Sequence, residues 1–401
     1  MLNDNKNRVL EILYHLCFVV YTTLSIIAFS PVIDEIWHII DRRTMFTVAN
    51  WGATAVLAII YIFKHHESKK EVILELFIAS VFILASLTNQ TVSNVFHLTQ
   101  WTTFMVVGMF IICATVTTFK RISIVSLATT LITVAAFHFA SHADLIASYT
   151  KNHSGATAHF MGFLYYTHPS YYMLFAWLMY MYIRGEKKIG WIELLAEFAL
   201  LVYLHNYTTC RLASVCTFIA LIAYVIIVKL ELIKLHWKFT GIVSIAGFSI
   251  CAAFTFITGL LYSPANTILS KINSVLSGRL HLVNLAFDRY NISLFGRLIK
   301  PMENESYFYL DSCYAYSLFG CGLVFFVVVM AMYTYMCYYA CKKNDKSLLV
   351  WLATLAIFGI VGDVWVHISY TPLILGFFIF LRESSALKKS EKNSVSTDNI
   401  I

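Results

Sequence analysis

Charged residues are scarce in this sequence. Asp, Glu, Lys and Arg together make up 13% of its 401 residues, whereas hydrophobic residues make up 59% and the mean hydropathy is +0.72. A soluble domain carries about a quarter charged residues, so the composition excludes an ordinary soluble domain. Apolar runs of roughly 20 residues, long enough to cross a bilayer as a helix, recur from end to end. The sequence therefore predicts an all-α polytopic membrane protein.

Several other signals are missing. The apolar runs do not alternate with polar residues, which argues against a transmembrane β-barrel. The nine cysteines form no CxxC pair or metal-binding spacing, so we interpret them as small buried residues. There is no P-loop, dinucleotide fingerprint or DxD-like pair, which argues against ATP and soluble sugar nucleotides as ligands. No cleavable signal peptide is evident, so the first apolar run is expected to remain as a span.

Hydropathy predicts about twelve membrane spans. They lie near residues 10–30, 46–63, 71–88, 101–118, 122–140, 168–184, 189–206, 209–228, 239–262, 314–340, 347–364 and 367–381. We expect residues 1–382 to form one transmembrane domain. Residues 383–401 are polar and lack aromatic side chains, which predicts a disordered cytoplasmic tail.

Basic residues indicate the orientation of the spans. They gather in alternate short loops, at 64–70, 120–121, 184–188, 229–238 and 341–346, and in both terminal segments. The opposing short loops are poor in Lys and Arg apart from Arg42 and Arg43. Because cytoplasmic loops attract Lys and Arg, both termini are predicted to be cytoplasmic. The same bias accounts for the net charge of +7, which therefore does not point to a nucleic-acid partner.

Two predicted outward loops are long, at about 141–167 and about 263–313. Loops of that length in a compact protein are usually functional or disordered. The second contains the stretch LSGRLHLVNLAFDRYNISLFGRLIKP (276–301), which is rich in polar groups for such an apolar chain.

Helical periodicity runs through this stretch, with apolar and polar residues recurring at three and four on opposite faces. The apolar positions are Leu280, Val283, Phe287 and Tyr290, and the polar positions are His281, Asn284, Asp288 and Asn291. The pattern predicts an amphipathic helix that packs on the membrane domain. A helix that simply lies at the membrane interface fits the same pattern.

Arg211 lies in HNYTTCRLAS (205–214), the predicted outward turn between two spans. With Thr208 or Thr209 as the N-cap, Arg211 falls in the first turn of a helix, where the helix dipole is positive and a cation is unfavourable. A bound anion would remove that conflict. The alternative is an arginine that reaches the lipid headgroups. We favour the anion site, since charges at the membrane edge are usually functional.

Ser277, Gly278 and Arg279 open the predicted amphipathic helix. A small residue and a glycine at a helix start can present backbone N–H groups to an oxyanion, although an ordinary turn has the same pattern. The segment gains interest because Arg279 and Arg211 are predicted on the same side of the membrane.

Asp311 stands where the long loop returns to the membrane, in YFYLDSCYAYSLFGCG (307–322). One interpretation is the N-cap of the following helix. The other is a carboxylate base at the water–membrane boundary. Three further polar residues lie at a similar depth: His168, which precedes a helix-opening proline, and Asp363 with His367. Each is weak evidence alone, and His168 fits a structural role as well as a substrate contact.

The order of these segments resembles the Wzy-type polymerases of bacterial capsule, exopolysaccharide and O-antigen synthesis. The likeness rests on a TTxxR-like turn, a long outer loop that opens with SGR, and LDSxYxYSLFGxGL. GFLYYTHPS (162–170) is similar to a GFxHPN stretch of capsular members, with Ser170 in place of the asparagine. His159 stands near a position where an arginine is expected. These enzymes are similar to the O-antigen ligases, and both are GT-C membrane glycosyltransferases.

The resemblance implies an enzyme that joins repeat units carried on undecaprenyl pyrophosphate, at the outer face of the cytoplasmic membrane, without metal or cofactor. Arg211 and Arg279 would stabilise the pyrophosphate leaving group and Asp311 would take the acceptor's proton. We also expect substrate contacts from His168, Arg297, Asp288, Asp363 and Tyr290. The partners would be the lipid-linked oligosaccharide, the bilayer, and a chain-length regulator and flippase of the same pathway.

Three alternatives remain. A lipid-linked oligosaccharide flippase would need charges near the midplane and two similar halves, which this chain lacks. An O-antigen ligase would carry a histidine near Asp311, and none occurs between His281 and His367. A sensor or channel is the non-enzymatic alternative.

Overall fold

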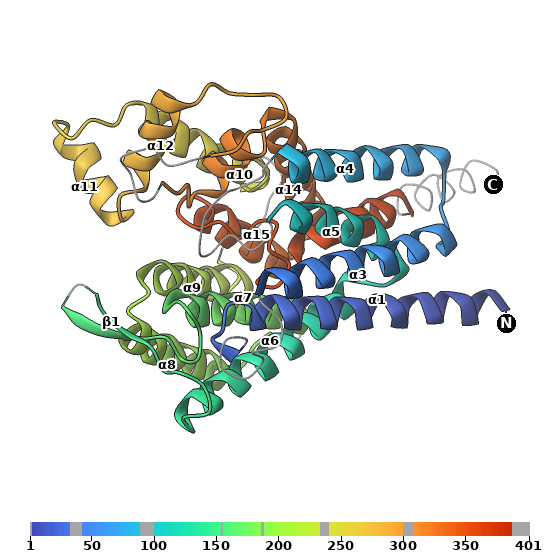
Figure 1. Cartoon of the computed structure of the whole chain (residues 1–401), viewed down its shortest axis with the longest axis horizontal. Helices are drawn as coiled ribbons and strands as arrows, with labels where there is room; N and C mark the ends of the chain where they lie inside the picture. Colours follow the sequence, from blue (N-terminus) through green and yellow to red (C-terminus); the bar gives the residue numbers. More distant parts are fainter. Residues whose placement is uncertain are drawn as a thin grey trace.

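The computed structural model describes residues 2–32, 42–88, 100–153, 155–185, 188–232, 240–299 and 308–386. Within these ranges the molecule is a bundle of helices with one short β-hairpin (Figure 1), so the predicted all-α class is confirmed in its main feature. Parts of several predicted segments lie outside the described residues: 186–187 and 233–238 of inward loops, 154 and 300–307 of the two long loops, and 387–401 of the tail. The Arg42 and Arg43 side chains lie outside them as well.

Seven of the described helical spans are long and apolar enough to cross a bilayer. They fall in α1 (Leu2–Ile27), α3 (Arg42–Phe63), α4 (Lys69–Thr88), α6 (Phe119–His142), α9 (Arg211–Ala223) with its π-helical continuation (Tyr224–Lys229), α10 (Thr240–Leu260) and α14 (Leu323–Lys343). Four more helices fill predicted spans: α5 (Gln100–Cys113), α7 (Thr167–Arg184), α8 (Trp191–Thr208) and α15 (Lys346–Phe358). The chain is a multi-pass membrane protein by the length and composition of these helices.

Two predicted spans differ from the structure. The tenth begins as a short α13 (Cys313–Ala315) and a π-helical turn (Tyr316–Gly320), and it breaks before α14. The last becomes helical only at residue 373 and continues to 386. The predicted tail therefore starts too early, because Glu383 is still helical and accepts a hydrogen bond from the Tyr339 hydroxyl.

Predicted inward loops meet at one end of the bundle. Arg382 Nε lies 2.5 Å from Glu71 Oε1 at the start of α4, and Arg121 Nη1 lies 2.5 Å from Glu11 Oε1 in α1. Exposed pairs of this kind contribute only about 0–1 kcal/mol each. Their value here is topological, because they join segments that the Lys/Arg bias assigns to one side of the membrane.

The two segments predicted as long loops project at the opposite end, away from the N-terminus (Figure 1). One folds into the antiparallel pair β1 (Thr150–His153) and β2 (Ala156–His159). The other contains two helices, α11 (Thr267–Val275) and α12 (Arg279–Arg289), where the sequence predicted one. The hairpin is the departure from the all-α prediction.

The predicted amphipathic helix is confirmed as α12. Leu280, Val283 and Ala286 are fully buried, and Phe287 packs edge-on against Phe319. Helix α12 lies against α10 at a glycine: a Cβ placed on Gly259 would fall 2.4 Å from a Val283 methyl. This close packing fixes the helix that carries Arg279.

The chain between α12 and α13 is clamped against the start of α14. Arg297 N donates to Gly320 O at 2.9 Å, and Leu323 N donates to Ser293 O at 2.9 Å. The two backbone segments cross at Gly296 and Gly322, which both have positive φ. A Cβ on Gly322 would fall 2.1 Å from Gly296 N. The glycines of the SLFGxGL segment thus serve a backbone crossing.

Candidate functional site

Arg279 and Asp311 form an ion pair between the guanidinium Nη2 and the carboxylate Oδ2. Arg279 is the first residue of α12 and Asp311 stands two residues before α13, so folding of the long loop brings them together. Their side chains are 28% and 20% exposed, so the pair is accessible from the molecular surface. Arg279 Nη1 also donates to Ser277 O at 2.8 Å, while its buried Nε has no partner.

The predicted capping role of Asp311 is wrong. The N-cap position of α13 belongs to Ser312, and no side chain caps that helix. Ser312 Oγ instead donates to Gly359 O at 3.1 Å, and Cys313 N donates to the same carbonyl at 2.9 Å. These bonds anchor the backbone beside Asp311, whose carboxylate is left to face Arg279.

Burial raises the pKa of the Asp311 carboxyl to about 6; the Arg279 charge opposes that rise and the charge of Asp363 adds to it. A carboxyl with a pKa near the operating pH suits general acid–base chemistry. Asp363 was predicted as a separate substrate contact, and in the structure its charge acts on Asp311.

Arg211 and Arg279 both act electrostatically on Tyr166, which precedes α7. Burial raises the pKa of the Tyr166 phenol, and the positive charges of Arg279 and Arg211 both oppose that rise. Tyr171, one turn into α7, lies within electrostatic range of both Arg279 and Asp311. The charges of the α8–α9 turn and of the long loop therefore act on the same tyrosine at the start of α7.

The structure changes the local picture at Arg211. Thr209 ends α8 in a left-handed conformation (φ 55°), and Cys210 occupies the N-cap of α9 without a side-chain bond. Our expectation that Thr208 or Thr209 caps α9 is therefore wrong. Arg211 is the first residue of α9 and is exposed, and it has no carboxylate partner in the ranges described. The unfavourable placement of a cation at a helix start thus stands.

The backbone anion site predicted at Ser277–Arg279 does not form. Ser277 N donates to Ser274 O, Gly278 N to Asn273 O, and Arg279 N to Leu276 O. Because these N–H groups are all used, an anion here would be held by the Arg279 side chain.

The structure also describes four other predicted substrate contacts. His168 is buried in α7, where its Nδ1 shares a hydrogen bond with the Tyr370 hydroxyl, so its position favours the structural role. Asp288 is exposed on α12. Tyr290 packs near the Phe308 ring, with centroids 6.0 Å apart. Arg297 is half-buried with an unpartnered Nε, but no contact joins it to Arg279 or Asp311.

Asp363 and His367 form a pair, which the sequence analysis did not predict. His367 Nε2 lies 3.8 Å from Asp363 Oδ2, with side chains 23% and 11% exposed. The spacing of four residues was the available signal. Among the described residues, no group of three His, Cys, Asp or Glu side chains could hold a metal ion.

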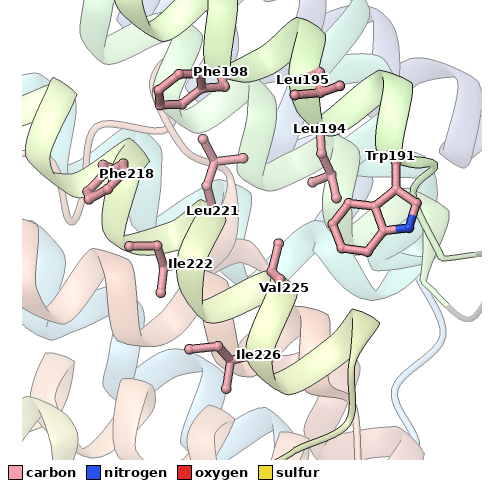
Figure 2. A pocket seen from close by; sticks show the side chains of 9 residues that line it. All are labelled: Trp191, Leu194, Leu195, Phe198, Phe218, Leu221, Ile222, Val225 and Ile226. Carbon is pink, nitrogen blue, oxygen red and sulfur yellow. The ribbon is translucent and has the colours of Figure 1, made fainter.

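An apolar groove of about 270 Å³ runs between α8 and α9, away from these charges (Figure 2). Its lining residues are all apolar or aromatic: Trp191, Leu194, Leu195, Phe198, Phe218, Leu221, Ile222, Val225 and Ile226. It has no polar group that could take part in chemistry.

Comparison with protein-family models, with curated proteins and with solved structures found no match for this chain.

Proposed function

We propose that this protein is a membrane glycosyltransferase that polymerises oligosaccharide repeat units carried on undecaprenyl pyrophosphate. The observation that carries the proposal is the Arg279–Asp311 pair, together with the charges of Arg211 and Arg279 that both act on Tyr166. Two arginines and a carboxyl of raised pKa form a set of groups that glycosyl transfer from a pyrophosphate requires.

The arginines would bind the leaving group. A glycosyl pyrophosphate departs as an anion and needs no proton, so catalysis requires positive charge at the departing oxygens. Guanidinium groups pair with phosphate oxygens in a bidentate manner. Arg211 offers an exposed guanidinium without a carboxylate partner in the described chain, and Arg279 can exchange its carboxylate for a phosphate.

Asp311 would act as the base. When Arg279 turns to the pyrophosphate, the Asp311 carboxylate is released close to the reacting carbon. The acceptor hydroxyl oxygen attacks the anomeric carbon, the bond from that carbon to the phosphate oxygen breaks, and the bonding electrons leave with the pyrophosphate. The hydroxyl proton passes to the carboxylate.

The proposal places the site at the outer face of the bacterial cytoplasmic membrane. About twelve helices would cross the bilayer with both termini cytoplasmic, and the segment 263–313 would cover the donor's pyrophosphate as a lid. The product would be a capsular polysaccharide, an exopolysaccharide or an O-antigen.

An O-antigen ligase is the second candidate, because the structure weakens the sequence argument against it. No histidine is close to Asp311 in the sequence, yet His367 pairs with Asp363, whose charge acts on Asp311. A ligase uses the same donor and transfers the glycan to a different lipid acceptor.

Purified protein in liposomes, supplied only with a lipid-linked repeat unit, tests the proposal. A polymerase should give a ladder of products of two or more units and release undecaprenyl pyrophosphate. Transfer that occurs only after lipid A–core acceptor is added identifies a ligase. No transfer with either acceptor, from protein that is folded and monodisperse, contradicts both.

A further inference from the structure

The Asp363–His367 pair is held against the segment that carries Asp311. Val364 N donates to Cys313 Sγ at 3.2 Å, and Cys313 Sγ contacts Asp363 Oδ1 at 4.0 Å. Cys313 is also fixed to Gly359 O through its own N–H at 2.9 Å. The turn after α15 and the approach to α13 therefore form one packed unit with two carboxylates on it.

These carboxylates share an incomplete set of counter-charges. Arg279 pairs with Asp311, and His367 is the one basic side chain that pairs with Asp363 in the described parts of the chain. Two carboxylates held on one packed unit disfavour each other's ionisation, the Asp363 charge raises the pKa of Asp311, and a neighbouring cation relieves the effect. The His367 imidazole offsets the Asp363 anion only when it carries a proton.

We propose that Asp363 and His367 are positioning residues that set the pH at which Asp311 can take the acceptor's proton. This inference rests on the proposed glycosyl transfer. Protonated His367 neutralises Asp363 and lets Asp311 ionise more easily. Neutral His367 leaves Asp363 as a bare anion that holds a proton on Asp311. Binding of the anionic donor to Arg279 would strengthen this dependence, since Asp311 then loses its own cation.

Few other groups can change charge here. Tyr171 faces Asp311, and the Cys313 thiol faces Asp363. Phenols and thiols stay neutral below about pH 8. Next to His367 lies Tyr370, which is hydrogen-bonded to buried His168.

The pH dependence of kcat/KM of the holoenzyme in liposomes, with the lipid-linked repeat unit as substrate, tests the inference. The acid limb is the low-pH side of this profile, where kcat/KM falls as Asp311 gains a proton. In Asp363→Asn the anion is lost, so the acid limb should move to lower pH by roughly 0.5–1 unit. In His367→Gln the anion is unopposed, so the limb should move up by a similar amount. The double variant has neither the anion nor the imidazole, so its limb should lie between those of the wild type and Asp363→Asn, well below that of His367→Gln.

Matched controls are Asp144→Asn and His142→Gln, exposed residues at the end of α6 and just beyond it, whose limbs should coincide with the wild-type limb. The limb position does not depend on the amount of folded protein, so poorly expressed variants remain informative. If the acid limbs of the two single variants shift in the same direction, or do not shift, the inference is overturned. Polymer formation by the wild type would still uphold the proposed function. A wild-type limb near pH 4, an ordinary aspartate value, also overturns the inference. No polymer from the wild type overturns both.

Discussion

The Arg279 guanidinium pairs with the Asp311 carboxylate across the mouth of the long loop. The contact joins a residue on the loop's helix to one at the loop's return into the bundle. Both side chains keep part of their surface exposed, so the pair can open without disturbing the core. If a donor phosphate took the place of the Asp311 carboxylate beside Arg279, donor binding would release the carboxylate to act as the base.

Asp311→Asn should abolish transfer while the protein still folds. Asparagine can accept a hydrogen bond from Arg279 but cannot take a proton, and loss of a general base costs about 10²–10⁴ in rate. Folding should survive because Asp311 caps no helix. Polymer length on gels and the level of membrane-inserted protein are the measurements. Asp311→Glu is the matched control, since it keeps the carboxylate. Near-normal polymer from Asp311→Asn would remove the base assignment.

Arg211→Lys and Arg279→Lys should each fail to support long polymer. Lysine keeps the charge but loses the planar, bidentate geometry that fits phosphate oxygens. Repeat units should accumulate on the lipid carrier, which mass spectrometry of extracted lipids can detect. Arg8→Lys serves as the control, because Arg8 is exposed near the start of α1 and has no predicted part in the site. Normal polymer from both Arg211→Lys and Arg279→Lys contradicts the pyrophosphate site.

Local patterns predicted the helices well, and they failed where distant segments meet. The period of α12 follows from its own residues, and its buried face was predicted at Leu280 and Val283. Asp311 looked like a helix cap because aspartate before an apolar run usually is one. Its partner Arg279 arrives through folding of the loop, which no local rule captures.

The Asp363–His367 pair illustrates the same limit. Spacing of four residues would place two side chains together on a helix, but here they lie in a turn beyond the end of α15. Their proximity to Asp311 depends on the bonds between Cys313 and the Gly359–Val364 segment. The β-hairpin was missed because its strands are only four residues each, too short for an alternating pattern to stand out.

Cysteine labelling should reveal opposite sides for the two ends of the bundle. Val275 in α11 is 79% exposed and Leu232 after α9 is 70% exposed. In a variant without the nine native cysteines, a membrane-impermeant maleimide should label Val275→Cys in intact cells. Leu232→Cys should react only after permeabilisation, because the Lys/Arg bias puts its loop inside. The reverse pattern would invert the topology and move the site to the cytoplasm.

Gly322→Ala and Gly296→Ala should destabilise the protein. Both glycines have positive φ, 94° and 82°, and a Cβ would fall 2.1 Å from Gly296 N or 2.2 Å from Gly320 O. Left-handed backbone costs a residue with a side chain about 1–2 kcal/mol, and overpacking adds about 1–3 kcal/mol. Thermal unfolding in detergent, followed by size-exclusion chromatography of heated samples, measures the loss.

Two other glycines separate these costs. A Cβ on Gly278 meets nothing within 4 Å although φ is 88°, so Gly278→Ala should show only the smaller backbone cost. Gly247 lies inside α10 with open space around it, so Gly247→Ala should be neutral or slightly stabilising. The expected order of stability is therefore Gly247→Ala, then Gly278→Ala, then Gly322→Ala. Equal stability of the first and last variants would mean that the loop is not clamped against α14, and the position of Asp311 opposite Arg279 would lose its structural basis.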